Sequence, residues 1–168
     1  MSSTPLSPKP RSIGTKRTIS IVASLYNEEL VNSLLNSTIE ELRRIMPSIT
    51  VPVYRVPGAF EIPVCAKHLL ENNPNDAIIA LGVIIKGETD HADLVANSVT
   101  TSLQNLALAN NIPIIHEVLL TENREQATER CQGVKNRGPE AAKAAVTMAE
   151  LFSSLNAIKD RKTGTSNG

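Results

Sequence analysis

Residues 77–85 (AIIALGVII) form a run of nine residues without a single charged or polar side chain. A strand with one face in water alternates apolar and polar residues, whereas this segment is apolar on both alternations. It is also less than half as long as a membrane-spanning helix, which needs about 20 residues. We therefore predict that it is the central strand of a parallel sheet with helices on both faces.

Short apolar segments alternate with longer segments of helical periodicity on both sides of this strand. The predicted strands are residues 18–24, 51–56, 77–85 and about 113–119, and the predicted helices are residues 27–46, about 60–71, about 90–109, 123–132 and 139 to about 158. Parallel strands joined by helices form three layers, so we predict a three-layer α/β/α, flavodoxin-like fold with a four-stranded parallel sheet and helices on both faces. The pattern leaves the order of the strands open.

The first and last predicted helices carry distinct features. Asn27 precedes the first helix, and asparagine is favoured at helix caps, while the charges of Glu28 and Glu29 suit a helix N-terminus. The last helix has one apolar face, which consists of Ala141, Ala144, Ala145, Met148, Leu151, Phe152 and Leu155. We expect this face to be the buried one.

The 168 residues correspond to one domain, which we predict over residues 18–158. A polar C-terminal tail, residues 159–168, follows it, and a disordered tail, residues 1–17, precedes it. The N-terminal tail is basic and contains serines, which are features of a short transit peptide. Its three prolines, Pro5, Pro8 and Pro10, oppose the amphipathic helix of such a peptide, so disorder is favoured.

Charge and cysteine content exclude several classes of function. The chain has 17 Lys plus Arg residues and 17 Asp plus Glu residues, so we expect neither nucleic acid nor a membrane as a partner. No apolar segment is long enough to span a membrane and no secretory signal is recognisable, which predicts a cytoplasmic location. Cys65 and Cys131 are far apart in the sequence, which favours two reduced core thiols over a disulfide or a metal site.

Two of the four aromatic residues, Tyr26 and Phe60, directly follow the first two predicted strands. Ligands of open α/β sheets bind at the carboxyl ends of the strands. Each aromatic side chain could therefore stack on a flat heterocycle, or it could close the top of the core. Glu61 could accept hydrogen bonds from ligand hydroxyls or interact with the dipole of the following helix.

The turn after the central strand, residues 86–91 (KGETDH), combines a lysine, a glycine and a helix N-terminus. Free backbone N–H groups around Gly87 would form an anion site suited to a phosphate. Glu88 and Asp90 would repel a phosphate unless their side chains point away. An ordinary turn is the alternative, because a single glycine before a helix is weak evidence for a phosphate site.

Two residues are candidates for proton transfer and charge stabilisation. His91 lies beside the predicted anion site, where an imidazole can donate a proton, although a lone histidine is more often structural. Arg130 could hold a phosphate as a second clamp, or it could form an ion pair on the surface. His116-Glu117 begins like a zinc-protease helix, but the second histidine is missing and the segment is a predicted strand.

Four segments around the ends of the predicted strands form a recognisable set: Tyr26-Asn27, 56–63 (VPGAFEIP), 82–91 (GVIIKGETDH) and 120–130 (LTENREQATER). From about Thr18 to Leu155 the chain resembles the lumazine synthase (6,7-dimethyl-8-ribityllumazine synthase) family. The resemblance implies a transferase of riboflavin biosynthesis, which condenses 5-amino-6-ribitylaminouracil with 3,4-dihydroxy-2-butanone 4-phosphate and releases phosphate and water. It also implies that these two small molecules are the partners and that no metal or organic cofactor takes part.

The resemblance further implies a role for each matching residue. Tyr26 would stack on the pyrimidine, Ala59, Phe60 and Glu61 would hold its ribityl side, and Val83, Ile84 and Ile85 would line the ring. Glu88 and Thr89 would offer backbone N–H groups to the phosphate, Arg130 would be the charged clamp, and His91 would be the catalytic proton donor. His116 would form a wall of the site from the neighbouring subunit.

Three positions depart from the family pattern. His116-Glu117 replaces Phe-Gly, Ala92 replaces an aromatic residue, and Leu25 replaces an arginine. These departures motivate a second hypothesis, a catalytically weakened protein that still binds flavin or lumazine. A flavodoxin-like receiver domain is a weaker third, because no acidic cluster follows the first strand.

Members of this family form homo-oligomers with the site between subunits, which implies the same for this chain. The assemblies are pentamers or multiples of pentamers. The sequence does not distinguish a pentamer from a decamer or a 60-subunit shell.

Overall fold

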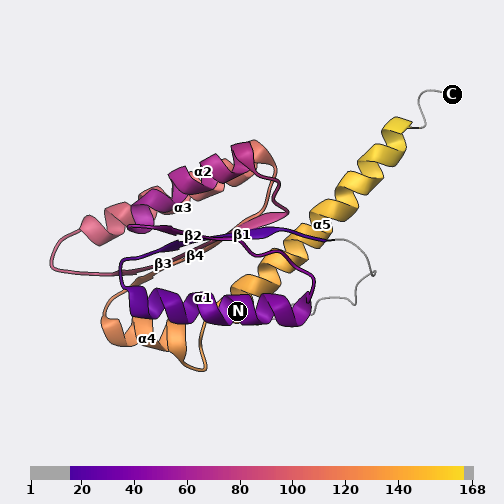
Figure 1. Cartoon of the computed structure of the whole chain (residues 1–168). Helices are drawn as coiled ribbons and strands as arrows, with labels where there is room; N and C mark the ends of the chain where they lie inside the picture. Colours follow the sequence, from indigo (N-terminus) through magenta and orange to yellow (C-terminus); the bar gives the residue numbers. More distant parts are fainter. Residues whose placement is uncertain (1–15, 165–168) are drawn as a thin grey trace, which may run out of the picture.

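A four-stranded parallel sheet between two layers of helices forms the protein in the computed structural model, which describes residues 16–164 (Figure 1). The strands are β1 (Ile19–Ser24), β2 (Val53–Val56), β3 (Ala77–Ile85) and β4 (Ile114–Thr121). The helices are α1 (Glu28–Ile45), the short 3-10 helix η1 (Ala59–Glu61), α2 (Ile62–Asn72), α3 (His91–Asn110), α4 (Arg124–Gln132) and α5 (Gly138–Gly164). The predicted three-layer fold is confirmed.

The strand order, which the sequence left open, is β2-β1-β3-β4. β3 lies between β1 and β4, and Ile79 has Ile21 on one side and Ile115 on the other. Helices α2 and α3 cover one face of the sheet, while α1, α4 and α5 cover the other (Figure 1). The prediction that residues 77–85 form a strand covered on both faces is confirmed.

Alternate residues of β3 belong to two separate cores. Ile79 and Leu81 pack in the core beneath α1, α4 and α5, whereas Ile78 and Ala80 pack in the core beneath α2 and α3. A strand projects successive side chains to opposite faces, so a strand covered twice must be apolar throughout. Only its last two residues, Ile84 and Ile85, are half-buried, at the carboxyl end of the sheet.

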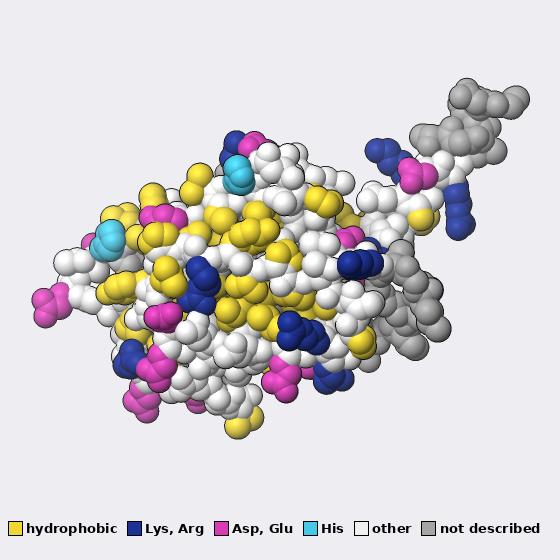
Figure 2. Space-filling model, in the orientation of Figure 1, with side chains coloured by type: hydrophobic (Ala, Val, Ile, Leu, Met, Phe, Trp, Pro, Cys, Tyr) yellow, Lys and Arg dark blue, Asp and Glu magenta, His cyan; other side chains and the backbone are white. Residues whose placement is uncertain are grey.

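The surface carries mixed charges. Figure 2 shows lysine and arginine side chains dispersed among acidic and hydrophobic ones, with no continuous basic band on the face presented. Hydrophobic side chains gather across the middle of this face, between the two helical layers of Figure 1. Within residues 16–164, no helix combines the length and the apolarity that crossing a membrane requires.

Residues 1–15 of the predicted disordered tail, residues 1–17, lie outside the described part of the chain. At Arg17 the prediction of disorder is wrong, because this residue has defined partners. The guanidinium of Arg17 forms an ion pair with Asp76 (Nη1–Oδ1 3.0 Å). Its carbonyl oxygen accepts a hydrogen bond from the Thr50 N–H at 2.8 Å. A charged residue is therefore fixed at the amino end of the sheet by a partner that is distant in sequence.

Helix α5 differs from its prediction in length and in orientation. It continues through Gly164 instead of ending near residue 158, so the predicted polar tail begins as helix; residues 165–168 lie outside the described part. Its buried residues are Ala141, Ala142, Ala145, Val146 and Ala149, while Leu151 and Leu155 are 47% and 52% exposed. The final turns of α5 extend beyond the sheet (Figure 1), where no layer remains to cover large side chains.

Gly138 allows the start of α5 to approach α1 closely. A Cβ at this position would overlap with Ser37 Oγ and would lie 2.7 Å from the carbonyl oxygen of Leu34. We expect Gly138→Ala to lower the free energy of unfolding by about 2–3 kcal/mol, because overpacking displaces the helix. Urea unfolding measures this loss. Gly87→Ala is the control, since the methyl group that it adds would have nothing within 4 Å, and equal stability of the two variants would contradict the prediction.

Candidate active site

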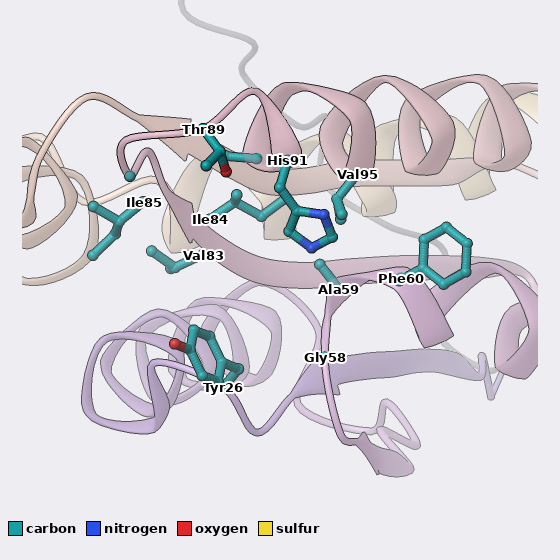
Figure 3. A pocket seen from close by; sticks show the side chains of 12 residues that line it. Tyr26, Gly58, Ala59, Phe60, Val83, Ile84, Ile85, Thr89, His91 and Val95 are labelled. Atoms are coloured by element: carbon teal, nitrogen blue, oxygen red, sulfur yellow. The ribbon is translucent and has the colours of Figure 1, made fainter.

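A cleft of about 440 Å³ lies at the carboxyl ends of the strands (Figure 3). Its lining comes from the turns after β1 and β2, from the end of β3 and from the start of α3. The lining residues are Tyr26, Gly58, Ala59, Phe60, Val83, Ile84, Ile85, Gly87, Thr89, His91, Ala92 and Val95. Most of the predicted site residues therefore meet in one cleft; Glu61, Glu88, His116 and Arg130 are not among its lining residues.

Hydrogen bonds fix Tyr26 at one side of this cleft. Its backbone N–H donates to the carbonyl oxygen of Pro57 at 3.0 Å. The next residue, Asn27, has a positive φ of 56°, and its side-chain Nδ2 donates to the carbonyl oxygen of Val83 at 2.8 Å. Asn27 is at the N-cap as predicted, but its side chain joins two strand ends instead of capping α1.

The aromatic side chains are exposed instead of filling the core. Tyr26 is 73% exposed and Phe60 is 60% exposed. In Figure 3, Tyr26 lies on the opposite side of the cleft from His91, and Phe60 lies at the far end from Ile85. The alternative that they close the top of the core is therefore wrong, and both remain available to a ligand.

Glu61 has a structural partner in the turn after β2. Its Oε2 accepts a hydrogen bond from the Gly58 N–H at 2.9 Å. This contact shapes the turn that places Ala59 and Phe60 at the cleft. The bond uses only Oε2 and leaves Oε1 without a hydrogen-bond partner among residues 16–164.

The turn between β3 and α3 places the N-terminus of α3 at the cleft, but Lys86, the lysine of this turn, does not line the cleft. Gly87 and Thr89 line the cleft, and α3 begins at His91. Lys86 points elsewhere: its Nζ pairs with Glu122 at 2.8 Å and with Asp93 at 3.5 Å. The hydrogen bond with Glu122 is the main cause that raises the pKa of Lys86. An anion here would be held by backbone N–H groups, not by this lysine as the sequence suggested.

His91 is exposed at the first residue of α3, and its ring lies over the floor of the cleft formed by the end of β3 (Figure 3). Within residues 16–164, no hydrogen bond or ion pair to another side chain holds the ring. An imidazole in this position can exchange a proton with a bound molecule.

Arg130 lies in a different pocket of about 410 Å³, bounded by the end of β4 and by α4. The other lining residues are Leu119, Leu120, Thr121, Gln126, Glu129 and Arg137. Within a single chain Arg130 therefore does not line the cleft that contains His91, and its role as a phosphate clamp stays a prediction. In the strand order β2-β1-β3-β4, the Tyr26 turn follows the inner strand β1, whereas the Arg130 pocket is built on the edge strand β4, on the other side of β3.

Two residues of β4 depart from the family pattern and have defined partners. His116 Nε2 forms a hydrogen bond with Thr100 Oγ1 of α3 at 2.9 Å, outside the cleft. Glu117 is buried, and its Oε1 accepts a hydrogen bond from Arg137 Nε at 2.8 Å. Sequence reasoning missed Arg137, although it lies in a predicted loop near Arg130, because nothing in the pattern links it to residue 117.

The cysteines are free, as expected of reduced thiols. Cys131 is fully buried and burial raises its pKa to about 11, so it is a poor nucleophile near neutral pH. Within the described residues, no group of three His, Cys, Asp or Glu side chains could hold a metal ion.

Comparison with known proteins identifies the family. The family model described as 6,7-dimethyl-8-ribityllumazine synthase matches residues 16–153. The chain belongs to the lumazine synthase family. A relative with that name from Protochlamydia amoebophila is 40% identical over 149 residues, which cover 87% of this chain and 86% of the relative. Another from Burkholderia multivorans is 40% identical over 153 residues, 90% of this chain and 87% of the relative.

Membership of the lumazine synthase family removes the receiver-domain hypothesis. The match includes the turns after β1, β2 and β3 and also the whole of α4, so both the cleft and the Arg130 pocket lie within it. The last turns of α5, from residue 154 onward, lie beyond it.

Proposed function

We propose that this protein is a 6,7-dimethyl-8-ribityllumazine synthase, a transferase of riboflavin biosynthesis. It condenses 5-amino-6-ribitylaminouracil with 3,4-dihydroxy-2-butanone 4-phosphate and releases phosphate and water. The observation that carries the proposal is that Tyr26, which is distant in sequence from Thr89 and His91, lines one cleft together with them. A flat ring, a phosphate and a proton donor can thus be held together.

The cleft suits the two substrates in different parts. Tyr26 stacks on the pyrimidine, while the backbone at Val83–Ile85 lines the ring and the η1 turn holds the ribityl chain. The backbone N–H groups of Glu88 and Thr89, at the N-terminus of α3, bind the phosphate. Holding an amine and a ketone in a reactive geometry supplies roughly 7–11 kcal/mol in favourable cases, so we assign most of the rate to positioning.

His91 carries the proton transfers of the reaction. It lines the cleft together with Tyr26 and Thr89, and we assign to it the proton that the attacking amine loses and those needed as water and phosphate leave. Positioned proton transfer contributes on the order of 10²–10⁴-fold to a rate.

A complete site requires a second copy of the chain. Among the described residues, no Lys or Arg lines the cleft, whereas Arg130 and His116 lie on the β4 side of the molecule. A neighbour that places its β4 edge against the cleft supplies both residues, and head-to-tail contacts of this kind close into a ring. We assign a homo-oligomer, a pentamer or a multiple of pentamers.

Light scattering tests the assembly. Five chains of 18.1 kDa give about 90 kDa, and larger assemblies give multiples of that mass. A monomer of 18.1 kDa under assay conditions would contradict the shared site, because each isolated cleft would lack its cation.

A lumazine absorbance assay tests the activity. Mixing the protein with the two named substrates should produce lumazine and one equivalent of phosphate. Binding of lumazine without turnover would instead favour the second candidate, the weakened binding protein, for which His116, Glu117 and Ala92 are the supporting observations. The cytoplasmic location and the lack of a nucleic-acid or membrane partner stay predictions.

A further inference from the structure

The pocket that contains Arg130 holds a second arginine, Arg137, at the start of α5. The two are joined through the backbone, since the Arg137 N–H donates to the carbonyl oxygen of Arg130 at 2.9 Å. The next residue, Gly138, packs too closely against α1 to move toward it. The backbone therefore keeps Arg130 and Arg137 next to each other, and both residues line one pocket.

Glu117 fixes the side chain of Arg137 within this pocket. Arg137 Nε donates to the Glu117 carboxylate at 2.8 Å, and Nη1 donates to Glu140 in the first turn of α5. Within residues 16–164, no hydrogen bond or ion pair uses the Nη2 amino group of Arg137 or the guanidinium of Arg130. Glu129, the acid that lines the pocket, is paired with Lys135 at 2.7 Å.

Stability alone does not account for the ion pair between Glu117 and Arg137. Glu117 is the one charged residue that is buried among the described side chains, with a side chain only 7% exposed. Burial raises its pKa even though the Arg137 guanidinium acts in the opposite direction. Buried ion pairs are often no more stabilising than apolar residues of similar volume, so the pair is better explained by what it does to the position of Arg137 than by stability.

We propose that Glu117 is a positioning residue that holds the Arg137 guanidinium beside Arg130, so that the two arginines receive one phosphate group. This inference rests on the proposed function, in which the ligand is the phosphate of the butanone substrate. Glu117 does not contact the phosphate. It acts through Nε of Arg137 and leaves Nη2 for the ligand, and a dianion gains from two guanidinium groups.

A double-mutant cycle tests this role. Glu117→Gln and Glu117→Ala should raise the KM for butanone phosphate about threefold and about tenfold, with kcat and the KM for the pyrimidine nearly unchanged. In an Arg137→Ala background, removing Glu117 should have no further effect, because the group through which it acts is already gone. Glu41→Gln is the matched control, since Glu41 is also largely buried and paired with an arginine, Arg44, but lies on α1 away from the pocket.

Three results would overturn the proposal. In the first, Glu117→Ala has the same effect whether or not Arg137 is present. In the second, the KM values for both substrates rise equally. In the third, Glu117→Ala lowers the melting temperature enough to explain the lost activity by unfolding alone. Titration with inorganic phosphate, read from the melting temperature, separates this inference from the proposed function. If the wild type forms no lumazine, phosphate should still stabilise it, and less so the Glu117→Ala and Arg137→Ala variants; no stabilisation of the wild type would also overturn the proposal.

Discussion

Replacing Arg130 by alanine should raise the KM for butanone phosphate by roughly a hundredfold, while the KM for the pyrimidine changes less than about threefold. The lost guanidinium makes charge-assisted hydrogen bonds to a phosphate, which are worth up to about 3 kcal/mol. Because Arg130 has no ion pair within the described residues, its removal leaves no unpaired acid behind and should cost little stability. Steady-state kinetics with each substrate varied in turn measures both values.

Arg124→Ala is the matched control for this experiment. Arg124 lies on the same helix, α4, but is exposed and paired with Glu29 at 2.8 Å. Its loss should leave both KM values unchanged. If Arg130→Ala raised the two KM values equally, its role as the phosphate clamp would be refuted.

Replacing His91 by alanine should lower kcat by about a hundredfold, the low end of what positioned proton transfer contributes, with little change in either KM. The effect is limited because positioning by the cleft walls remains intact. The exposed ring has no structural partner among residues 16–164, so the melting temperature should stay the same. Single-turnover measurements isolate the chemical step, and a wild-type rate in this variant would remove His91 from the mechanism.

The two variants together test whether the site is shared between subunits. If each site takes His91 from one chain and Arg130 from its neighbour, equal co-expression of the two variants restores about one quarter of the sites by random assembly. If both residues came from one chain, no site would be restored. Recovery of activity in the mixed oligomer therefore decides between the two arrangements.

Elements with strong periodicity were predictable from the sequence. The nine apolar residues of β3 indicated a strand with both faces covered, and the strands β1 and β4 followed from shorter apolar segments. The face of α5 was predicted incorrectly because alanines, not the larger Leu151 and Leu155, lie against α1 and the sheet. Periodicity shows that residues share a face, but the space between packed elements decides which face is buried.

The candidate site was predictable where its residues directly follow strands. Tyr26, Phe60, Thr89 and His91 occupy turns at the carboxyl edge, and parallel strands bring such turns together. Lys86 was assigned wrongly to the anion site, since its partners Glu122 and Asp93 come from other elements. A long charged side chain can pair with any of several acidic residues. Which of them lies within reach depends on how the other elements pack, and the local sequence does not show this.

By itself, the sequence determined the layered parallel fold, the family and the residues at the carboxyl edge, because backbone geometry links local pattern to strands, helices and turns. Only the tertiary structure decided the strand order, the distance between the cleft and the Arg130 pocket, and the pairing of Glu117 with Arg137. Those features depend on which distant segments become neighbours. Such contacts arise when the whole core is packed and charges are taken out of water, and no short segment specifies them.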